Sequence, residues 1–178
     1  MKFGSITTGI VSDGLVFNMD AANRASYPAQ RTFTTSESGS CYNTLDTTQS
    51  GSFISDPQFI TLPTSASCWS LDGIDDYIDL GTNSSLNVGG SAFSVSLWAK
   101  WAMSSGNAIP FLEIGSFTDK ILVSTGFNQI GMIGFEAGTV WNYNAGSGLN
   151  DNTWHHICCT YNGSTSVIYV DSISEALW

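Results

Sequence analysis

The stretch WSLDGIDDYIDL, residues 69–80, concentrates the side chains whose types and spacing most suggest chemistry. Asp72, Asp75 and Asp76 surround Gly73 there, so their carboxylates are candidate ligands for Ca²⁺, which prefers carboxylate and carbonyl oxygens. The alternative is that Asp72 and Asp75 accept backbone N–H bonds as Asx-turns and build the connection between two strands. Because the spacing does not match an EF-hand loop, we favour the turn and keep Ca²⁺ as the one cofactor that the sequence suggests.

Catalytic chemistry finds little support in the remaining acids and histidines. A glycoside hydrolase needs two carboxyl groups about 5–10 Å apart across a cleft, but the glutamates follow no closely spaced pattern and the aspartates cluster in one turn. His155 and His156 are adjacent, so in a strand they face opposite ways and cannot both join one site. We expect one of them to be buried and hydrogen-bonded and the other to lie on the surface. The sequence therefore predicts a protein that is not an enzyme.

The four cysteines do not have the spacing of a zinc site. Cys158 and Cys159 are adjacent, and Cys41 and Cys68 lie far apart in the chain. We interpret all of them as small buried apolar residues. A disulfide between Cys41 and Cys68 is the alternative, which a cytoplasmic origin disfavours.

Short strand-like runs separated by turn residues must position these side chains, and no helix of convincing length is predicted. The clearest strand is 92–101, in which Phe93 and alternate residues share one face while Trp98 lies on the other, placed to stack on a sugar or to line an interface. Roughly ten short strands without crossover helices indicate an all-β antiparallel sandwich or jelly roll. The expected strands are 14–20, 58–62, 68–73, 76–81, 92–101, 110–115, 120–125, 130–137, 153–161 and 166–171.

Composition and charge exclude several classes of protein. A hydrophobic fraction of 42% in 178 residues argues for a packed globule and against disorder. The net charge of −10, with only 5 basic residues, excludes a phosphate-binding face, so nucleic acid is not an expected partner. No apolar run approaches the roughly 18–20 residues that span a bilayer, and the N-terminus lacks the apolar core of a signal peptide. We therefore expect a chain made in the cytoplasm without a membrane partner.

The ordered set of segments DGLVFNMDAANRASYP, SLDGIDDYIDLG, FSVSLWAKW, WHHICCTYNGS and VIYVDS, between residues 13 and 172, resembles a known family. It is similar to the laminin-G-like domains of the concanavalin A-like lectin/glucanase superfamily, above all to the versions in bacteriophage structural proteins and large bacterial surface proteins. The resemblance implies a jelly roll of two packed antiparallel sheets, with Trp154 in its core. Members bind glycans or proteins, often with Ca²⁺ at the rim, and others are structural only.

The resemblance also sets the expected domain organisation, with one departure. We expect an N-terminal arm or extra strand at 1–12 and a single laminin-G-like jelly roll at 13–178, in which the polar stretch 32–56 is a long loop or two weak strands. Such domains usually continue with further strands after the Y-V-D-G turn, where this chain has Ser172 and soon ends. Three alternatives stay open: the last strands are lacking, a neighbouring subunit supplies them, or residues 1–12 replace them.

Two functions follow from this reading. The first is a virion structural protein, most simply a capsid decoration protein or a head or tail fibre component, that uses a lectin-like jelly roll to dock on the virion surface. Its partners would be a major capsid or fibre protein and further copies of itself. The second is a glycan-binding adhesion module of a phage or bacterial surface protein, whose partner would be a cell-surface glycan. Its candidate binding residues are Trp98, Trp101, Trp141 and Tyr143.

Overall fold

The computed structural model describes residues 13–28, 40–63, 66–83, 86–87, 92–103, 109–116, 119–125, 133–137 and 140–177. Its described elements are all β-strands that pair antiparallel, as the sequence predicted. The chain divides into two compact units, residues 1–86 and 87–178, and each is described by itself. Within the described ranges, no helix has the length and apolar character needed to cross a membrane.

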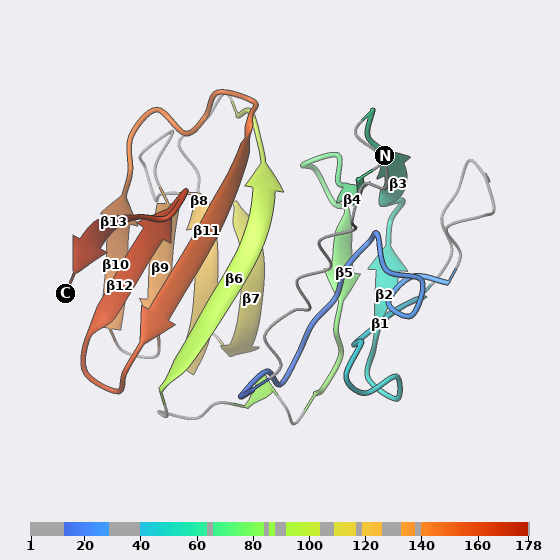
Figure 1. Ribbon diagram of the computed structural model, residues 1–178, viewed down its shortest axis with the longest axis horizontal. Coiled ribbons are helices and arrows are strands. Elements are labelled where there is room, and N and C mark those ends of the chain that lie inside the picture. Colours follow the sequence, from blue (N-terminus) through green and yellow to red (C-terminus); the bar gives the residue numbers. More distant parts are fainter. Residues whose placement is uncertain are drawn as a thin grey trace, which may run out of the picture. The chain divides into compact units, whose positions relative to one another are not determined.

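The first unit contains a three-stranded sheet in the order β1-β2-β5 and a separate hairpin, β3-β4 (Figure 1). Tyr27 is fully buried in this unit, and its ring packs against Phe53, Phe59 and Trp69 at centroid distances of 5.5, 5.0 and 6.3 Å. This aromatic cluster joins the sheet, the hairpin and the N-terminal segment. The strands are β1 (Ser40–Tyr42), β2 (Ser50–Ile54), β3 (Gln58–Thr61), β4 (Ser67–Ser70) and β5 (Tyr77–Asp79).

One sequence expectation changes in this unit, and for 32–56 the second of the two stated alternatives, two short strands, holds in the described part. Residues 14–20 form no strand, because their polar groups bond to the buried Asn43 side chain and to Thr44 and not to a continuous ladder: Asn18 N donates to Asn43 Oδ1 at 3.0 Å, and Thr44 N donates to Asn18 O at 2.9 Å. The described part of 32–56 holds two strands, β1 and β2, so it is not a continuous loop. Short strands of three and five residues explain why the sequence showed so little periodicity.

The second unit is a sandwich of two four-stranded antiparallel sheets, in the orders β13-β12-β11-β6 and β10-β9-β8-β7. Figure 1 shows the two sheets lying one behind the other, with β6, β11, β12 and β13 in front. The longest pairing joins β6 and β11 over eight register pairs, from Trp154 opposite Lys100 to Tyr161 opposite Phe93. The strands are β6 (Phe93–Lys100), β7 (Pro110–Ser116), β8 (Asp119–Thr125), β9 (Ile133–Ala137), β10 (Val140–Ala145), β11 (Trp154–Tyr161), β12 (Ser166–Val170) and β13 (Ile173–Leu177).

The core of this sandwich lies between β8 on one sheet and β11 and β12 on the other. Ile157 and Ile168 are fully buried and pack with Val123 of the facing sheet. Burial of each such aliphatic side chain stabilises the fold by about 1.5–3 kcal/mol. Every second residue of β11 faces this core, which fixes the opposite set as the outer face of the sheet.

The C-terminal end corrects the expectation that the chain lacks strands after residue 172. β13 follows that position and pairs with β12, so at least one further strand is present. Asp171 and Ser172 make the connecting turn at φ angles of 50° and 71°, a left-handed conformation that glycine would adopt without strain. The predicted arm at 1–12 lies outside the described residues, and the single jelly roll over 13–178 stays a prediction.

Candidate functional site

The outer face of the β6–β11 pair carries the most exposed tryptophan of the described residues. Trp98 lies directly opposite His156, and Lys100 lies directly opposite Trp154, so these four residues form a block of two by two on one face of the sheet. We call this block the aromatic face. Trp98 and Trp154 lie on one diagonal of the block, and Lys100 and His156 lie on the other.

The aromatic face has accessible tryptophans, one of which packs against its histidine. Trp98 is 66% exposed and Trp154 is 36% exposed. The Trp98 and His156 rings pack with centroids 5.1 Å apart and planes at 45°, and the His156 Nε2 lies 2.8 Å from the Ser96 hydroxyl. Trp98 therefore presents a large apolar surface to solvent while one neighbour limits its rotation.

The rest of this outer face is polar without being charged. Register places Ser96 opposite Cys158, and Thr160 opposite Ser94, on the side of the strands that carries Trp98. Hydroxyl groups beside an exposed indole ring suit a ligand that has both an apolar ring face and hydroxyls, which describes a pyranose.

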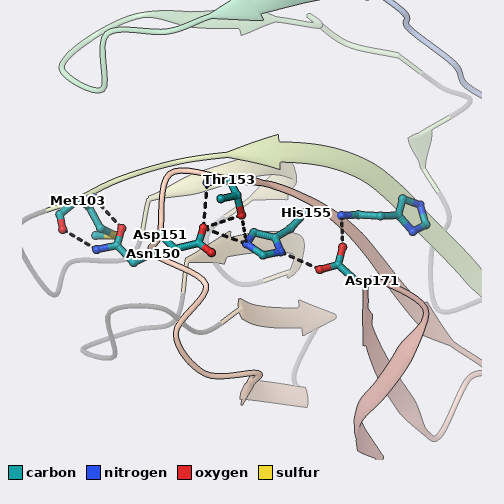
Figure 2. Close-up of polar contacts among 7 residues, drawn as sticks. Met103, Asn150, Asp151, Thr153, His155 and Asp171 are labelled. Carbon is teal, nitrogen blue, oxygen red and sulfur yellow. Dashed lines mark hydrogen bonds and ion pairs between the residues drawn. The ribbon is translucent and has the colours of Figure 1, made fainter. Parts of the chain in front are cut away.

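A network behind this face fixes the beginning of β11 (Figure 2). His155 is buried, and its Nδ1–H donates to Asp171 Oδ2 at 2.8 Å, while Nε2 lies 3.3 Å from Asp151 Oδ1 and 3.2 Å from the Thr153 hydroxyl. The other oxygen of Asp171 accepts the His156 N–H at 2.9 Å. We call Asp151, Thr153, His155 and Asp171 the histidine clamp, and through His156 it holds the strand that carries half of the aromatic face.

The electrostatics of the histidine clamp favour a charged imidazolium. Burial lowers the pKa of His155, but the hydrogen bonds and charges of Asp171 and Asp151 outweigh it, so the pKa lies above its ordinary value. The His155 hydrogen bond, followed by that of the His156 N–H, lowers the pKa of Asp171. The hydrogen bonds from Thr153 contribute most to lowering the pKa of Asp151. The clamp therefore places His155 between two carboxylates that favour its protonated form.

A second contact ties the loop before β11 to the loop after β6. The Asn150 side chain donates to Met103 O at 2.8 Å and accepts the Met103 N–H at 2.7 Å, as Figure 2 shows. Asn152 N donates to Trp101 O at 3.1 Å. The strand pair that carries the aromatic face is thus closed at this end by paired backbone and amide groups.

The residue types of the histidine clamp, a hydroxyl, a histidine and two carboxylates, resemble those of a catalytic site. The histidine, however, is not accessible to a substrate. Both ring nitrogens of His155 face the protein's own Asp151, Thr153 and Asp171 within hydrogen-bonding distance, and its side chain is buried. A general base must reach the proton of a bound substrate. This geometry supports a structural role for His155, and it confirms the expectation that one histidine is buried and the other lies at the surface.

Of the predicted glycan-binding residues, Trp98 and Trp101 lie on different faces of the sheet. Trp101 lies on the core side of its strand, where its ring packs against Phe111 at 5.0 Å and His155 at 5.6 Å, so it does not join Trp98. Trp141 and Tyr143 belong to β10, whose side chains lie outside the described residues.

The expected core position of Trp154 is wrong. Alternation along β11 turns His155, Ile157 and Cys159 inward, so Trp154 points outward with His156. The alternation itself was the available signal, because a strand that buries Ile157 must expose the residue three positions earlier.

The acidic turn, residues 72–76 of the first unit, is built by backbone hydrogen bonds. Asp72 Oδ1 accepts the Ile74 N–H at 2.8 Å, and Gly73 supplies a φ of +76°. Asp76 accepts the N–H groups of Asp72 at 3.0 Å and Asp56 at 2.8 Å through its two oxygens. The interpretation of Asp72 as a turn-building residue is confirmed, and Asp76 is the second aspartate that accepts backbone N–H groups, in place of the predicted Asp75.

The same turn brings three carboxylates close enough to be compared with a cation site. One oxygen from each of Asp72, Asp75 and Asp76 can lie within 4.8 Å of the others. Asp75 Oδ2 also accepts the Ser55 hydroxyl at 3.0 Å, so most of these oxygens already serve the turn. Ca²⁺ takes about six to eight oxygens, and the set therefore fits Ca²⁺ only with several added ligands.

The cysteines form no disulfide, and burial disfavours the thiolate form of three of them. All four are free, including Cys41 and Cys68. Burial raises the pKa of Cys41 to about 11 and that of Cys159 to about 12, and it also raises the pKa of Cys158. A protonated buried thiol is a poor nucleophile and a poor metal ligand, so the prediction of small buried apolar residues is confirmed for Cys41 and Cys159, whereas Cys68 and Cys158 are only partly buried.

Comparison with known proteins assigns the chain to a family. Residues 72–176, more than half of the 178-residue chain, match the family model described as the concanavalin A-like lectin/glucanases superfamily. No curated protein matches the sequence. Among solved structures, the chain is similar to residues 221–444 of an S-layer domain-containing protein from Clostridium thermocellum. The two are 19% identical, with a TM-score of 0.42 over 83% of this chain and 67% of that chain, and a likeness of this size carries no argument about function.

Proposed function

The chain belongs to the concanavalin A-like lectin/glucanases superfamily, and we propose that it is a non-catalytic binding module that recognises glycans through the aromatic face. The observation that carries the proposal is the exposure of Trp98, which is 66% accessible in a strand whose other large apolar residues face the core. Large aromatic side chains bury about 150–250 Å² each when they are covered, so an exposed one leaves that stabilisation available to a partner.

A sugar rather than an apolar ligand is favoured by the surroundings of Trp98. The His156 ring packs against the indole, and the Ser96 hydroxyl bonded to that ring adds a second hydrogen-bonding group beside it. Glycans bind by stacking of their C–H faces on aromatic rings and by hydrogen bonds from their hydroxyls to such side chains. The family includes lectins by its description, which agrees with this assignment.

Binding without catalysis is supported by the acids of the same unit. The described residues on the outer side of β6 and β11 include no carboxylate, and Asp151 and Asp171 are engaged with His155. Glycoside hydrolysis needs a pair of carboxyl groups on opposite sides of the scissile bond. Nothing in this face offers that pair.

The test is binding of the purified chain to a broad glycan array, with Trp98→Ala as the variant. We expect retention of defined glycans by the parent chain and at least a tenfold loss with Trp98→Ala, because stacking on an aromatic ring is worth about 1–3 kcal/mol. Tyr77→Ala is the matched control, since Tyr77 is 52% exposed on β5 of the first unit. Equal losses in both variants, or no retained glycan, would contradict the proposal.

A second candidate is the structural role in a virion, in which the chain docks on a major capsid or fibre protein and assembles with further copies of itself. The observation that favours it is β13, which ends the described order of its sheet and carries Ile173 at 63% exposure. An open edge strand can pair with another chain. Recovery of the chain at fixed stoichiometry in purified particles would support this role, and its absence from them would rule it out.

A further inference from the structure

We infer that the aromatic face selects glycans that carry carboxylate groups, such as chains of uronic acids, and that Lys100 is the residue that makes this selection. The inference rests on the proposed function, since it names the class of glycan that the same face would hold. Its basis is the distribution of charge in a strongly acidic chain.

Positive charge is rare in this protein, and one of its few cations lies on the aromatic face. The chain has 5 lysines and arginines against 15 acidic residues. In the second unit, residues 87–178, the only lysines or arginines are Lys100 and Lys120, and Lys120 belongs to β8 of the other sheet. Lys100 is exposed, and no ion pair engages it among the described residues.

The aromatic face itself is free of competing negative charge. Along β6 and β11, the described outward residues are serine, threonine, tryptophan, histidine, cysteine and lysine. The nearby carboxylates are engaged: Asp171 bonds to the His155 ring and to the His156 N–H through its two oxygens, and one oxygen of Asp151 contacts the His155 ring. In a strongly acidic chain, the aromatic face therefore combines an exposed cation with a neighbouring tryptophan.

The spacing suits a sugar acid. Trp98 and Lys100 are two residues apart on one strand, so their side chains leave the same face about 6.5–7 Å apart. A pyranose stacked on Trp98 would place an exocyclic carboxylate within the span of the flexible Lys100 side chain. Its ring hydroxyls would meet His156 and Ser96 on the neighbouring positions. A neutral sugar would make the same stacking contact without the ion pair.

The expected consequence is a preference for the charged ligand that weakens with salt. A partly desolvated ammonium–carboxylate contact corresponds to about a tenfold difference in Kd between the acid and its neutral counterpart. Salt screens exposed charges, with a Debye length that falls from about 10 Å at 0.1 M to about 3 Å at 1 M. The preference should therefore shrink as salt is added, while stacking on Trp98 persists.

The experiment compares two ligands that differ only in charge: oligogalacturonate and the same oligomer with its carboxylates methyl-esterified. Dissociation constants are measured by calorimetry for the parent chain, Lys100→Gln and Trp98→Ala. Arg24→Gln is the matched control, because Arg24 is an exposed cation of the first unit. We expect the acid to bind about tenfold tighter than the ester at low salt, Lys100→Gln to remove the difference, and Arg24→Gln to leave it unchanged.

The outcomes separate this inference from the proposed function. Equal binding of the acid and the ester, both lost with Trp98→Ala, would overturn the role of Lys100 and leave glycan binding standing. A preference for the acid that Arg24→Gln removes as well as Lys100→Gln would overturn the inference too, since diffuse charge would explain it. Binding of neither oligomer, together with silence on the glycan array, would overturn both.

Discussion

The acidic turn of the first unit and the histidine clamp of the second are both built from aspartates, but their carboxylates have different tasks. In the acidic turn, Asp72 and Asp76 accept backbone N–H groups and define the path of one short connection. In the histidine clamp, Asp171 lies in the turn between β12 and β13 and bonds to the buried His155 ring and to the His156 N–H, both on β11. The difference shows that clustering of acids along the sequence does not locate a ligand site.

The contrast extends to what each region presents to solvent. The acidic turn exposes Ile74 at 86% together with carboxylates, and its oxygens are largely consumed by the turn itself. The histidine clamp buries its imidazole between two half-exposed carboxylates and leaves an exposed tryptophan on the other side of the same strand pair. A site for a ligand is therefore expected where the polar groups of the protein are already satisfied and an apolar ring is left uncovered.

The sharpest test of this contrast is removal of one aspartate from each region. Asp171→Ala deletes the partners of the His155 ring and the His156 N–H, so we expect a loss of about 1–2 kcal/mol in the free energy of unfolding after allowance for its partial exposure. Asp72→Ala removes only exposed turn bonds and should cost less. Urea unfolding of both variants measures the difference, and an equal or reversed order would refute the distinction.

The next effect is the dependence of stability on pH through His155. Its folded-state pKa lies above the ordinary value of 6.5, so its contribution is fully present below that value and is lost as pH rises through the folded pKa. The difference in free energy of unfolding between the parent chain and His155→Gln should accordingly be larger at pH 5.5 than at pH 8.5. Asp151 and Asp171 stay ionised across this window because their pKa values are lowered. A difference that is constant with pH would show that folding does not raise the pKa of His155.

The smallest expected effect concerns Ca²⁺ at the acidic turn. Because Asp72, Asp75 and Asp76 are occupied by the bonds of the turn, adding millimolar Ca²⁺ or EDTA should shift the Tm of the chain by less than about 1 °C. An Asp75→Asn variant is the control for any shift that is seen. A rise in Tm with Ca²⁺ that Asp75→Asn abolishes would make this turn a cation site.

Local patterns in the sequence predicted part of the fold and of the site. Alternation along 92–101 identified the outward position of Trp98, because a strand that faces one core must alternate. By the same reasoning, the adjacency of His155 and His156 predicted that their side chains point to opposite faces of the strand. Trp154 was misplaced where a family expectation was preferred to the alternation of β11.

Contacts between distant residues could not be predicted in the same way. Asp171 reaches His155 across 16 positions through the β11–β12 pairing, and only the register of the strands brings them together. The Asn43 side chain, 25 positions along the chain, accepts the Asn18 N–H that a neighbouring strand would otherwise accept. Neither partner has a periodic signature, because a single hydrogen-bonding side chain leaves no repeating pattern along the chain.

The central claim, that the ligand meets the aromatic face and not the acidic turn, is tested most directly by NMR titration of the ¹⁵N-labelled chain with oligogalacturonate. The account predicts shifts of the Trp98 indole N–H and of the His156 and Lys100 amides, while the amides of residues 72–76 and the indole N–H of the core-facing Trp101 stay in place. Shifts confined to residues 72–76, or none at saturating oligomer, would contradict it.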